Sequence, residues 1–239
     1  MTQKFSRHVG VSSNALKSPR NLLATLLAIL LQRFSTVGTN MDEYQRSGMS
    51  LHRVERGRKY LNLDERRRFR IAAGAAPDDI RLFCLTLMWS GSRISETLAL
   101  TPAAIDLDDG VAIFETLKRR RRGVIRQVPL PQDLLRDLDS IFGIRKAQCD
   151  PSKSARRLWR WSRATAWRHV KVLMKAAGIP VGAAMPKGLR HTFGVIAFQS
   201  APPHMVQRWL GHASPRTTAI YGDVCGPDER MFAARMWEE

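Results

Sequence analysis

The sequence of 239 residues is poor in acidic residues and in cysteine. Asp and Glu total 21 against 39 Lys and Arg, a formal net charge of +18. This imbalance points to a polyanionic partner, nucleic acid or an anionic membrane surface, although a basic surface that only aids solubility stays open. The three cysteines, Cys84, Cys149 and Cys225, lie far apart and suit neither a disulfide framework nor a Cys-x-x-Cys metal knuckle. A reducing compartment, the cytoplasm, is therefore expected.

Long hydrophobic runs and metal-ligand patterns are also missing. The apolar run at 22–31 follows a basic region and imitates a signal peptide, but ten residues are too few to span a bilayer and no small-x-small cleavage site follows. We expect this run to form a buried helix, or to lie outside the native protein if translation starts at Met41 or Met49. The scattered histidines have no ligand spacing, so we expect no metal and no cofactor.

Hydrophobic periodicity predicts a mainly helical chain with a small antiparallel β-sheet, an α+β protein. Hydrophobic residues make up 44%, enough for a real core. We expect a short helical segment at 1–50 and one larger domain at 51–239. Within that domain the patterns predict two strands and a loop, at 111–117, 124–130 and 147–154. They also predict helices at 64–73, 77–89, from 93 onward, at 131–142, at 162–177, and in three short segments after Pro186.

Those last segments carry the chemistry-bearing residues. They read PKGLRHTF at 186–193, WLGHAS at 209–214 and TTAIYG at 217–222. Prolines at helix starts and a glycine at a helix end punctuate them, and Ser214 is placed to cap a helix that opens with Pro215. We therefore expect Arg190, His212 and Tyr221 on three consecutive short helices, folded back so that a cation, an imidazole and a phenol meet in one pocket.

The three segments resemble the tyrosine recombinases, the phage-integrase family. That family has an arginine in a His-x-x-Arg box, a Leu-Gly-His box and a nucleophilic tyrosine, matched here by Arg190, by 210–212 and by Tyr221. An upstream Gly-x-Arg-x-x-Glu box matches at 91–96. The resemblance implies the tyrosine-recombinase catalytic domain fold for 51–239, with Arg93 as first catalytic arginine and Glu96 as its orienting neighbour. From spacing alone, Arg93 and Glu96 share one face of a helical turn, where a surface salt bridge is the simpler alternative.

The resemblance implies chemistry that these residue types can perform. A phosphodiester is anionic and gains charge at the pentavalent stage, so two guanidiniums, Arg93 and Arg190, would clamp its oxygens. Tyr221 would attack phosphorus to give a 3′-phosphotyrosyl enzyme, which conserves the bond energy for rejoining. Lys118, the only lysine between the two predicted strands, would protonate the departing 5′-oxygen, and His212 would bind a phosphate oxygen.

The chain departs from the family pattern in two places. The position three residues before Arg190 is Lys187 where the family usually has histidine. We infer that Lys187 contacts phosphate, and that it could act as base for Tyr221 if burial lowers its pKa. His191, beside Arg190, is expected to be supporting and structural. Residues 1–50 are too few for the family's full DNA-clamping domain, so a truncated one is expected.

Basic side chains outside the predicted pocket are assigned to double-stranded DNA. Residues 52–70 are strongly basic, and the turn between the two strands is nearly all arginine. Tryptophans at 159, 161 and 167 are expected to be core residues rather than base-stacking platforms. The side chains assigned to DNA contacts are Arg119, Arg120, Arg121, Arg122, Arg163, Thr165 and Arg168.

The preferred function is site-specific recombination or integration for a mobile element, by a homotetramer on DNA held together through the tail 223–239. That tail could instead pack on its own domain. A type IB topoisomerase-like enzyme would relax DNA as a monomer and needs no second site. A DNA-binding protein that has lost catalysis is the third possibility, motivated by Lys187 and the short N-terminal segment. A membrane-surface protein is the weakest, because no exposed apolar face accompanies the basic segments.

Overall fold

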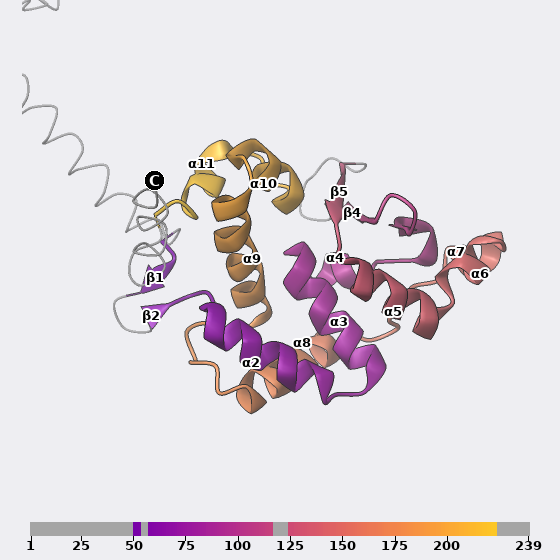
Figure 1. Ribbon diagram of the computed structural model, residues 1–239, viewed down its shortest axis with the longest axis horizontal. Coiled ribbons are helices and arrows are strands. Elements are labelled where there is room, and N and C mark those ends of the chain that lie inside the picture. Colours follow the sequence, from indigo (N-terminus) through magenta and orange to yellow (C-terminus); the bar gives the residue numbers. More distant parts are fainter. Residues whose placement is uncertain (1–49, 54–56, 117–123, 224–239) are drawn as a thin grey trace, which may run out of the picture. The chain divides into compact units, whose positions relative to one another are not determined.

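The computed structural model describes residues 50–53, 57–116 and 124–223, and the elements below belong to the unit Leu51–Glu239. This part of the chain is mainly helical (Figure 1), as expected. The helices, labelled as in Figure 1, are α2 Leu63–Gly74, α3 Asp78–Ser90, α4 Ile94–Leu98, the 3₁₀ turn η1 Pro102–Ala104, α5 Gln132–Phe142, α6 Ile144–Gln148, α7 Pro151–Ser154, α8 Arg163–Ala176, α9 Pro186–Ser200, α10 Pro203–Leu210 and α11 Pro215–Ala219.

A small antiparallel sheet accompanies the helices. Its strand order is β3-β4-β5, with β3 at Ile105–Asp106, β4 at Val111–Glu115 and β5 at Ile125–Pro129. The register pairs Phe114 with Arg126. β4 and β5 confirm the two predicted strands. The sequence analysis missed β3 and a separate pair of two-residue strands, β1 His52–Arg53 and β2 Gly57–Arg58, because two residues are too few to show an alternating pattern.

Helix starts follow the capping signals in the sequence. Asn62 accepts a hydrogen bond from the Glu65 amide, and the Glu65 carboxylate accepts one from the Asn62 amide, which is a complete capping box for α2. Ser162 and Ser214 cap α8 and α11 in the same way, each accepting from an amide of the first turn. These caps satisfy amides that would otherwise have no partner, so the predicted helix starts are confirmed.

Helix α3 is the centre of the described fold. It packs against α2, α5 and α9 (Figure 1), which fits its almost wholly apolar sequence. Leu82, Phe83 and Leu87 are buried, and burial of side chains of this size contributes about 1.5–3 kcal/mol each. Trp159 packs edge-on against Phe83, with ring centroids 5.3 Å apart, and its indole N–H donates to the Asp79 carbonyl at 2.8 Å. This apolar centre gives α9 a rigid support.

Gly91 ends α3 in the left-handed conformation, with φ +60°. A side chain there would be strained, and a Cβ would lie 2.4 Å from the Phe193 ring of α9. Glycine therefore lets the end of α3 approach α9 closely. This close approach places the Gly91 carbonyl within reach of Arg190.

Three expectations need correction or refinement. Residues 147–154 are not a loop, because Pro151 opens the short helix α7 with Asp150 as its cap, and α6 precedes it. The helix expected from 93 onward, for which the neighbouring Ser92 is the natural cap by residue type, has Arg93 as its N-cap residue, while the Ser92 hydroxyl bonds Thr97 and Ser90. Of the three tryptophans, Trp159 is core, Trp161 is half-buried and Trp167 is 46% exposed.

Several predictions concern residues outside the described ranges. The helix at 22–31, the tail from 224 and the segment 117–123 with Lys118 and the four arginines are among them. The division into segments 1–50 and 51–239 with separate roles therefore stays a prediction. None of the helices in the described residues has the length and hydropathy needed to cross a bilayer.

Candidate active site

Arg190, His212 and Tyr221 come together as expected, but they do not lie on three helices. Arg190 lies in α9, one turn after its start at Pro186. His212 follows Gly211, which ends α10 with φ +64°, and Tyr221 follows the cap of α11. His212 and Tyr221 therefore lie just after short helices. Gly211 ends α10 before His212, and the short helix α11 ends before Tyr221. We call Arg93, Glu96, Arg126, Arg190, His191, His212 and Tyr221 the Arg190 cluster.

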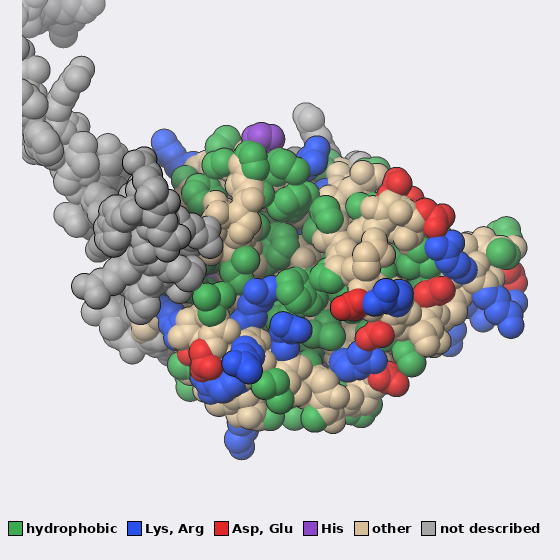
Figure 2. Space-filling model, viewed as in Figure 1, with side chains coloured by type: hydrophobic (Ala, Val, Ile, Leu, Met, Phe, Trp, Pro, Cys, Tyr) green, Lys and Arg blue, Asp and Glu red, His purple; other side chains and the backbone are tan. Residues whose placement is uncertain are grey.

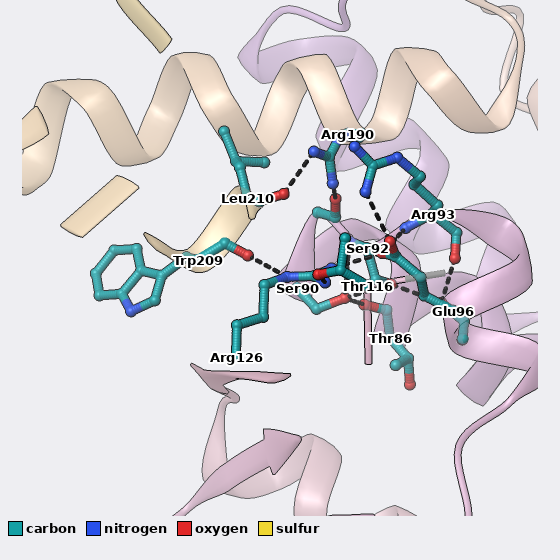
Figure 3. Close-up of polar contacts among 12 residues, drawn as sticks. Thr86, Ser90, Ser92, Arg93, Glu96, Thr116, Arg126, Arg190, Trp209 and Leu210 are labelled. Carbon is teal, nitrogen blue, oxygen red and sulfur yellow. Dashed lines mark hydrogen bonds and ion pairs between the residues drawn. The ribbon is translucent and has the colours of Figure 1, made fainter. Parts of the chain in front are cut away.

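Arg190 is buried and held between the ends of two helices. Its guanidinium donates to the Gly91 carbonyl at 2.7 Å and to the Leu210 carbonyl at 2.6 Å (Figure 3). Carbonyls at helix C-termini carry partial negative charge, which favours a cation there. A guanidinium has five N–H donors, so donors remain for an anion after these two bonds. Burial, together with the charge of Arg93, lowers the pKa of Arg190 to about 10, so the group stays cationic at neutral pH.

Arg93 and Glu96 are ordered by the first turn of α4. The Glu96 carboxylate accepts from the Arg93 backbone amide at 2.9 Å and from the Arg93 guanidinium at 2.6 Å. The Arg93 side chain is 31% exposed, whereas that of Glu96 is 1% exposed. The pair is therefore not a surface salt bridge: a buried carboxylate orients an arginine whose other face is open to a ligand.

Sequence reasoning missed Arg126. This residue lies on β5, and its guanidinium donates to the second Glu96 carboxylate oxygen at 2.6 Å and to the Trp209 carbonyl at 2.7 Å (Figure 3). Its side chain is 3% exposed. The signal was present in the alternation of β5, because Arg126 shares the inward face with the buried Val128.

Tyr221 is buried, 2% exposed, among three close neighbours. The His212 ring is stacked on it with an interplanar angle of 12° and centroids 6.1 Å apart. The phenol oxygen lies 3.3 Å from His191 Nδ1. A Cβ on Gly194 would lie 2.4 Å from the Tyr221 ring carbon Cζ, so the bare backbone of α9 forms the floor under the ring. His212 is itself held by a 2.9 Å bond between Nδ1 and the Thr218 hydroxyl.

The electrostatics of the cluster favour a negative ligand. Burial, together with the charge of nearby Lys187, lowers the pKa of His191 to about 3. Burial and the charge of Arg190 likewise lower the pKa of His212 to about 3, so both imidazoles are neutral at pH 7. Burial raises the pKa of Tyr221 to about 12, against the opposing effect of Arg190 and Arg93. Charged arginines beside uncharged acid–base groups leave an excess of positive charge that an anion would neutralise.

Glu96 is the exception, because it stays ionised among the cations. Burial acts to raise its pKa, but the charge of Arg126 and the hydrogen bonds from Arg93 and Arg126 outweigh burial and lower it. Burial lowers the pKa of Arg126 in turn, and Glu96 opposes this effect. His191 Nε2 is buried and has no hydrogen-bond partner among the residues that the structure describes.

The remaining predicted site residues lie outside the cluster. Lys187, in the first turn of α9, is exposed, so the burial that its role as base required is not observed. Arg163 and Arg168 are exposed near the start of α8, with Thr165 half-buried between them. Lys118 and Arg119 to Arg122 lie outside the described residues.

Positive charge also gathers away from the cluster. Figure 2 shows Lys and Arg side chains over α2 and mixed acidic and basic side chains over α5. On α2, the Arg66 guanidinium lies 4.3 Å from the centroid of the Trp89 ring, a cation–π contact. Among residues 50–53, 57–116 and 124–223, no group of three or more His, Cys, Asp or Glu side chains could hold a metal ion.

A phosphodiester would suit the arrangement. Two arginines with donors to spare could bind its oxygens, a neutral imidazole could donate another hydrogen bond, and a phenol lies beside them as nucleophile. The described cluster contains a base candidate in contact with the phenol, His191.

Comparison with known proteins places the chain in a family. Residues 59–225 match the model of the phage integrase family, so the chain belongs to that family and its fold is that of a tyrosine-recombinase catalytic domain.

The curated relatives are tyrosine recombinases. XerA of Pyrococcus furiosus is 32% identical over 149 residues, which cover 60% of this chain and 50% of XerA. XerD of Mycobacterium tuberculosis is 34% identical over 149 residues, which cover 57% of this chain and 45% of XerD. The chain thus matches about half the length of these relatives.

The fold is shared with solved structures. A crystal structure of XerA recombinase superposes with a TM-score of 0.62 at 25% identity, covering 75% of this chain and 65% of that one. XerH recombinase bound to its palindromic difH substrate, in a post-cleavage complex, gives a TM-score of 0.60 at 22% identity, covering 76% and 54%. At that identity the second likeness concerns the fold alone.

Proposed function

We propose that this protein is a site-specific tyrosine recombinase or integrase that cuts and rejoins double-stranded DNA through a 3′-phosphotyrosyl intermediate at Tyr221. The observation that carries the proposal is the convergence of Arg93, Arg190, His212 and Tyr221 in one buried cluster. Its family membership and its recombinase relatives support the same activity.

The reaction requires each group in a defined role. Arg93 and Arg190 bind the non-bridging oxygens of the scissile phosphate and stabilise the charge that develops at the pentavalent stage. His212 donates a hydrogen bond to a phosphate oxygen. The Tyr221 oxygen forms a bond to phosphorus while the bond to the 5′-oxygen breaks, and Lys118 gives that oxygen its proton.

The phenol proton needs an acceptor. His191 and Lys187 are the two candidates, and His191 is the better placed. His191 Nδ1 lies 3.3 Å from the phenol oxygen and its neutral ring can accept, whereas Lys187 is exposed. We assign Lys187 to a phosphate contact at the rim of the site. Arg119 to Arg122, Arg163, Thr165 and Arg168 would grip the duplex through its backbone.

The finer parts of the proposal concern assembly and context. Recombination joins two duplexes, so four protomers would assemble on DNA, with the tail 223–239 as the contact between them. We place the protein in the cytoplasm, because the proposed reaction needs access to DNA, and we assign the reaction to a mobile element.

One observation favours a second function, a DNA-binding protein without catalysis. Tyr221 is 2% exposed and its pKa is raised to about 12, so the nucleophile would have to be uncovered and activated. The test is covalent trapping: nicked duplexes carrying sites from the ends of the host element are incubated with the protein and with Tyr221→Phe, then run on a denaturing gel. An adduct that Tyr221→Phe lacks supports the enzyme. Duplex binding without an adduct supports the second function.

A topoisomerase IB-like enzyme would also form the adduct. A two-site recombination assay beside a supercoil relaxation assay separates the two activities. Joint products from two sites support recombination, and relaxation without any joint product supports the topoisomerase.

A further inference from the structure

Arg126 ties together three parts of the chain that are far apart in sequence. Figure 3 shows its guanidinium reaching from β5 toward Glu96 and toward the end of α10. One bond joins it to Glu96, 30 residues away, and another to the Trp209 carbonyl, 83 residues away. A third, at 3.4 Å, joins it to the Thr116 hydroxyl beyond β4. A buried guanidinium with three different partners has little freedom left, so it fixes their relative positions.

The bond to Glu96 bears on Arg93. The Glu96 carboxylate has two oxygens: the Arg93 guanidinium bonds Oε1, and the Arg126 guanidinium bonds Oε2 beside the Arg93 backbone amide. With Arg126 present, the Glu96 charge is matched by a fully buried cation. The charge of the partly exposed Arg93 is then not neutralised within the protein and can attract an incoming anion. Without Arg126, Arg93 would be the sole cation bonded to a buried carboxylate and would be held to it more tightly.

The bond to Trp209 bears on His212. The last two carbonyls of α10 are each bound by an arginine, Trp209 by Arg126 and Leu210 by Arg190. The next residue, Gly211, lies against the Arg126 stem: a Cβ there would be 3.1 Å from Arg126 Cδ. His212 comes directly after this contact. The segment that presents His212 is thus held by Arg126 on one side and by Arg190 on the other.

We propose that Arg126 is a positioning residue of the reaction, which neutralises Glu96 so that Arg93 can bind phosphate and which fixes the Trp209–Gly211 segment that presents His212. The proposal deepens the proposed function and rests on it. Arg126 itself touches neither Tyr221 nor a reacting atom in this account. Its effect on the rate passes through Arg93 and His212.

The test compares variants that remove different parts of the Arg126 side chain. Arg126→Met removes the charge and the bonds but keeps the stem, and Arg126→Lys keeps the charge without the planar fork. Glu96→Gln with Arg126→Met removes both buried charges, so it remains informative if Arg126→Met alone fails to fold. Arg145→Met is the matched control, an arginine ion-paired to Asp108 on the exposed face.

The first readout is the single-turnover rate of adduct formation on a nicked duplex, beside the dissociation constant of the duplex. We expect Arg126→Met to lower the rate about 100-fold, as loss of one positioned charge-stabilising group does, with duplex affinity within about threefold. A methylphosphonate at the scissile position lacks the phosphate charge, so the deficit should shrink there. Arg126→Lys should recover part of the rate. A normal rate for Arg126→Met, or an equal deficit on both substrates, would overturn the proposal.

The second readout does not depend on catalysis. The ring nitrogens of His212 are titrated by NMR in the full chain without DNA, where its pKa is expected at about 3. Arg126→Met should raise that pKa, because a nearby positive charge is lost, and shift the His212 ring signals, while Arg145→Met should leave both unchanged. If the wild type forms no adduct but His212 responds in this way, the recombinase function fails and the positioning role stands. An unmoved His212 in folded Arg126→Met overturns the role.

Discussion

The ion pairs around Glu96 and those on the α5–α7 side use the same side-chain types in opposite surroundings. Glu96 and Arg126 are 1% and 3% exposed, whereas Arg145 and Asp108 are 60% and 81% exposed. Arg136 and Asp133 on α5 are exposed as well. Water screens an exposed pair, which contributes about 0–1 kcal/mol, but breaking a buried pair costs about 3–5 kcal/mol.

The difference shows where this chain uses charge for geometry. Around Glu96 the donors are bonded to buried, fixed acceptors and have little room to move, so an ion pair there fixes the direction of a catalytic arginine. On the α5–α7 side the exposed ion pairs can exchange their partners for water. The predictions below test whether burial, rather than the number of ion pairs, decides the effect of a substitution.

The largest effect is expected at Arg190. Arg190→Ala removes a charge-stabilising donor together with the bonds to the Gly91 and Leu210 carbonyls. The single-turnover rate of adduct formation should fall by about 10²–10³-fold, with duplex affinity little changed. Arg190→Lys is the control, since it keeps the charge but cannot reach both carbonyls with a planar fork. A rate within tenfold of wild type for Arg190→Ala contradicts the clamp.

Glu96→Gln should give the largest loss of stability. It leaves the buried Arg126 guanidinium without its counter-charge, so the free energy of unfolding should fall by about 3 kcal/mol. Urea denaturation followed by circular dichroism measures the change. An unfolding midpoint equal to that of wild type would mean that the Glu96 charge does not stabilise the fold.

Much of the fold behind these effects could be predicted from the sequence. Ser214 caps the helix that it was expected to cap, and Asn62 and Ser162 cap α2 and α8, because capping depends on residues three or fewer positions apart. The strands β4 and β5 follow from alternation. Residues 147–154 were misread because Pro151 is equally typical of a loop and of a first helical turn.

The site could be predicted only in part. The order of the motifs identified Arg93, Arg190, His212 and Tyr221. How these residues converge depends on where the short helices α10 and α11 end. Arg126 belongs to no motif, and its partners lie 30 and 83 residues away. Such long-range contacts leave no local pattern beyond the inward face that Arg126 shares with Val128.

A smaller effect is expected at Gly194, the residue of α9 that lies against the Tyr221 ring. Gly194→Ala places a Cβ where the Tyr221 ring now lies, 2.4 Å from Cζ. Overpacking of this kind costs about 1–3 kcal/mol, and the displaced ring should slow adduct formation about tenfold. Thermal unfolding and the adduct assay measure the two effects. Gly74→Ala on α2, where a Cβ meets nothing within 4 Å, is the matched control.

The pH dependence of stability should be gradual and of known sign. The pKa of His191 falls from 6.5 to about 3 on folding, so between these values the unfolded chain binds more protons. The contribution of His191 to the free energy of unfolding should therefore be greatest above about pH 6.5 and decrease as the pH falls toward 3.

Urea denaturation at a series of pH values measures this dependence. His191→Gln should reduce the slope between pH 6.5 and 4 without abolishing it, because His212 has its pKa lowered over the same range. A curve of unchanged slope in that variant would show that His191 is not the group responsible.

The smallest effect is expected for an exposed pair. Asp108→Asn breaks the ion pair with Arg145 but leaves both groups in water, so the unfolding midpoint should stay close to that of wild type. Denaturation side by side with Glu96→Gln makes the comparison direct. Equal losses in the two variants would show that burial does not distinguish the two regions.

The measurement that tests the central claim most directly is peptide mapping of the covalent adduct. The protein is trapped on a nicked duplex, digested with protease and nuclease, and analysed by mass spectrometry. The account predicts a nucleotide phosphate attached to the peptide that contains Tyr221, through its phenol oxygen, and to no other tyrosine. Attachment at Tyr44 or Tyr60 would contradict this expectation. So would a complete digest in which the DNA has been cleaved but the Tyr221 peptide is unmodified.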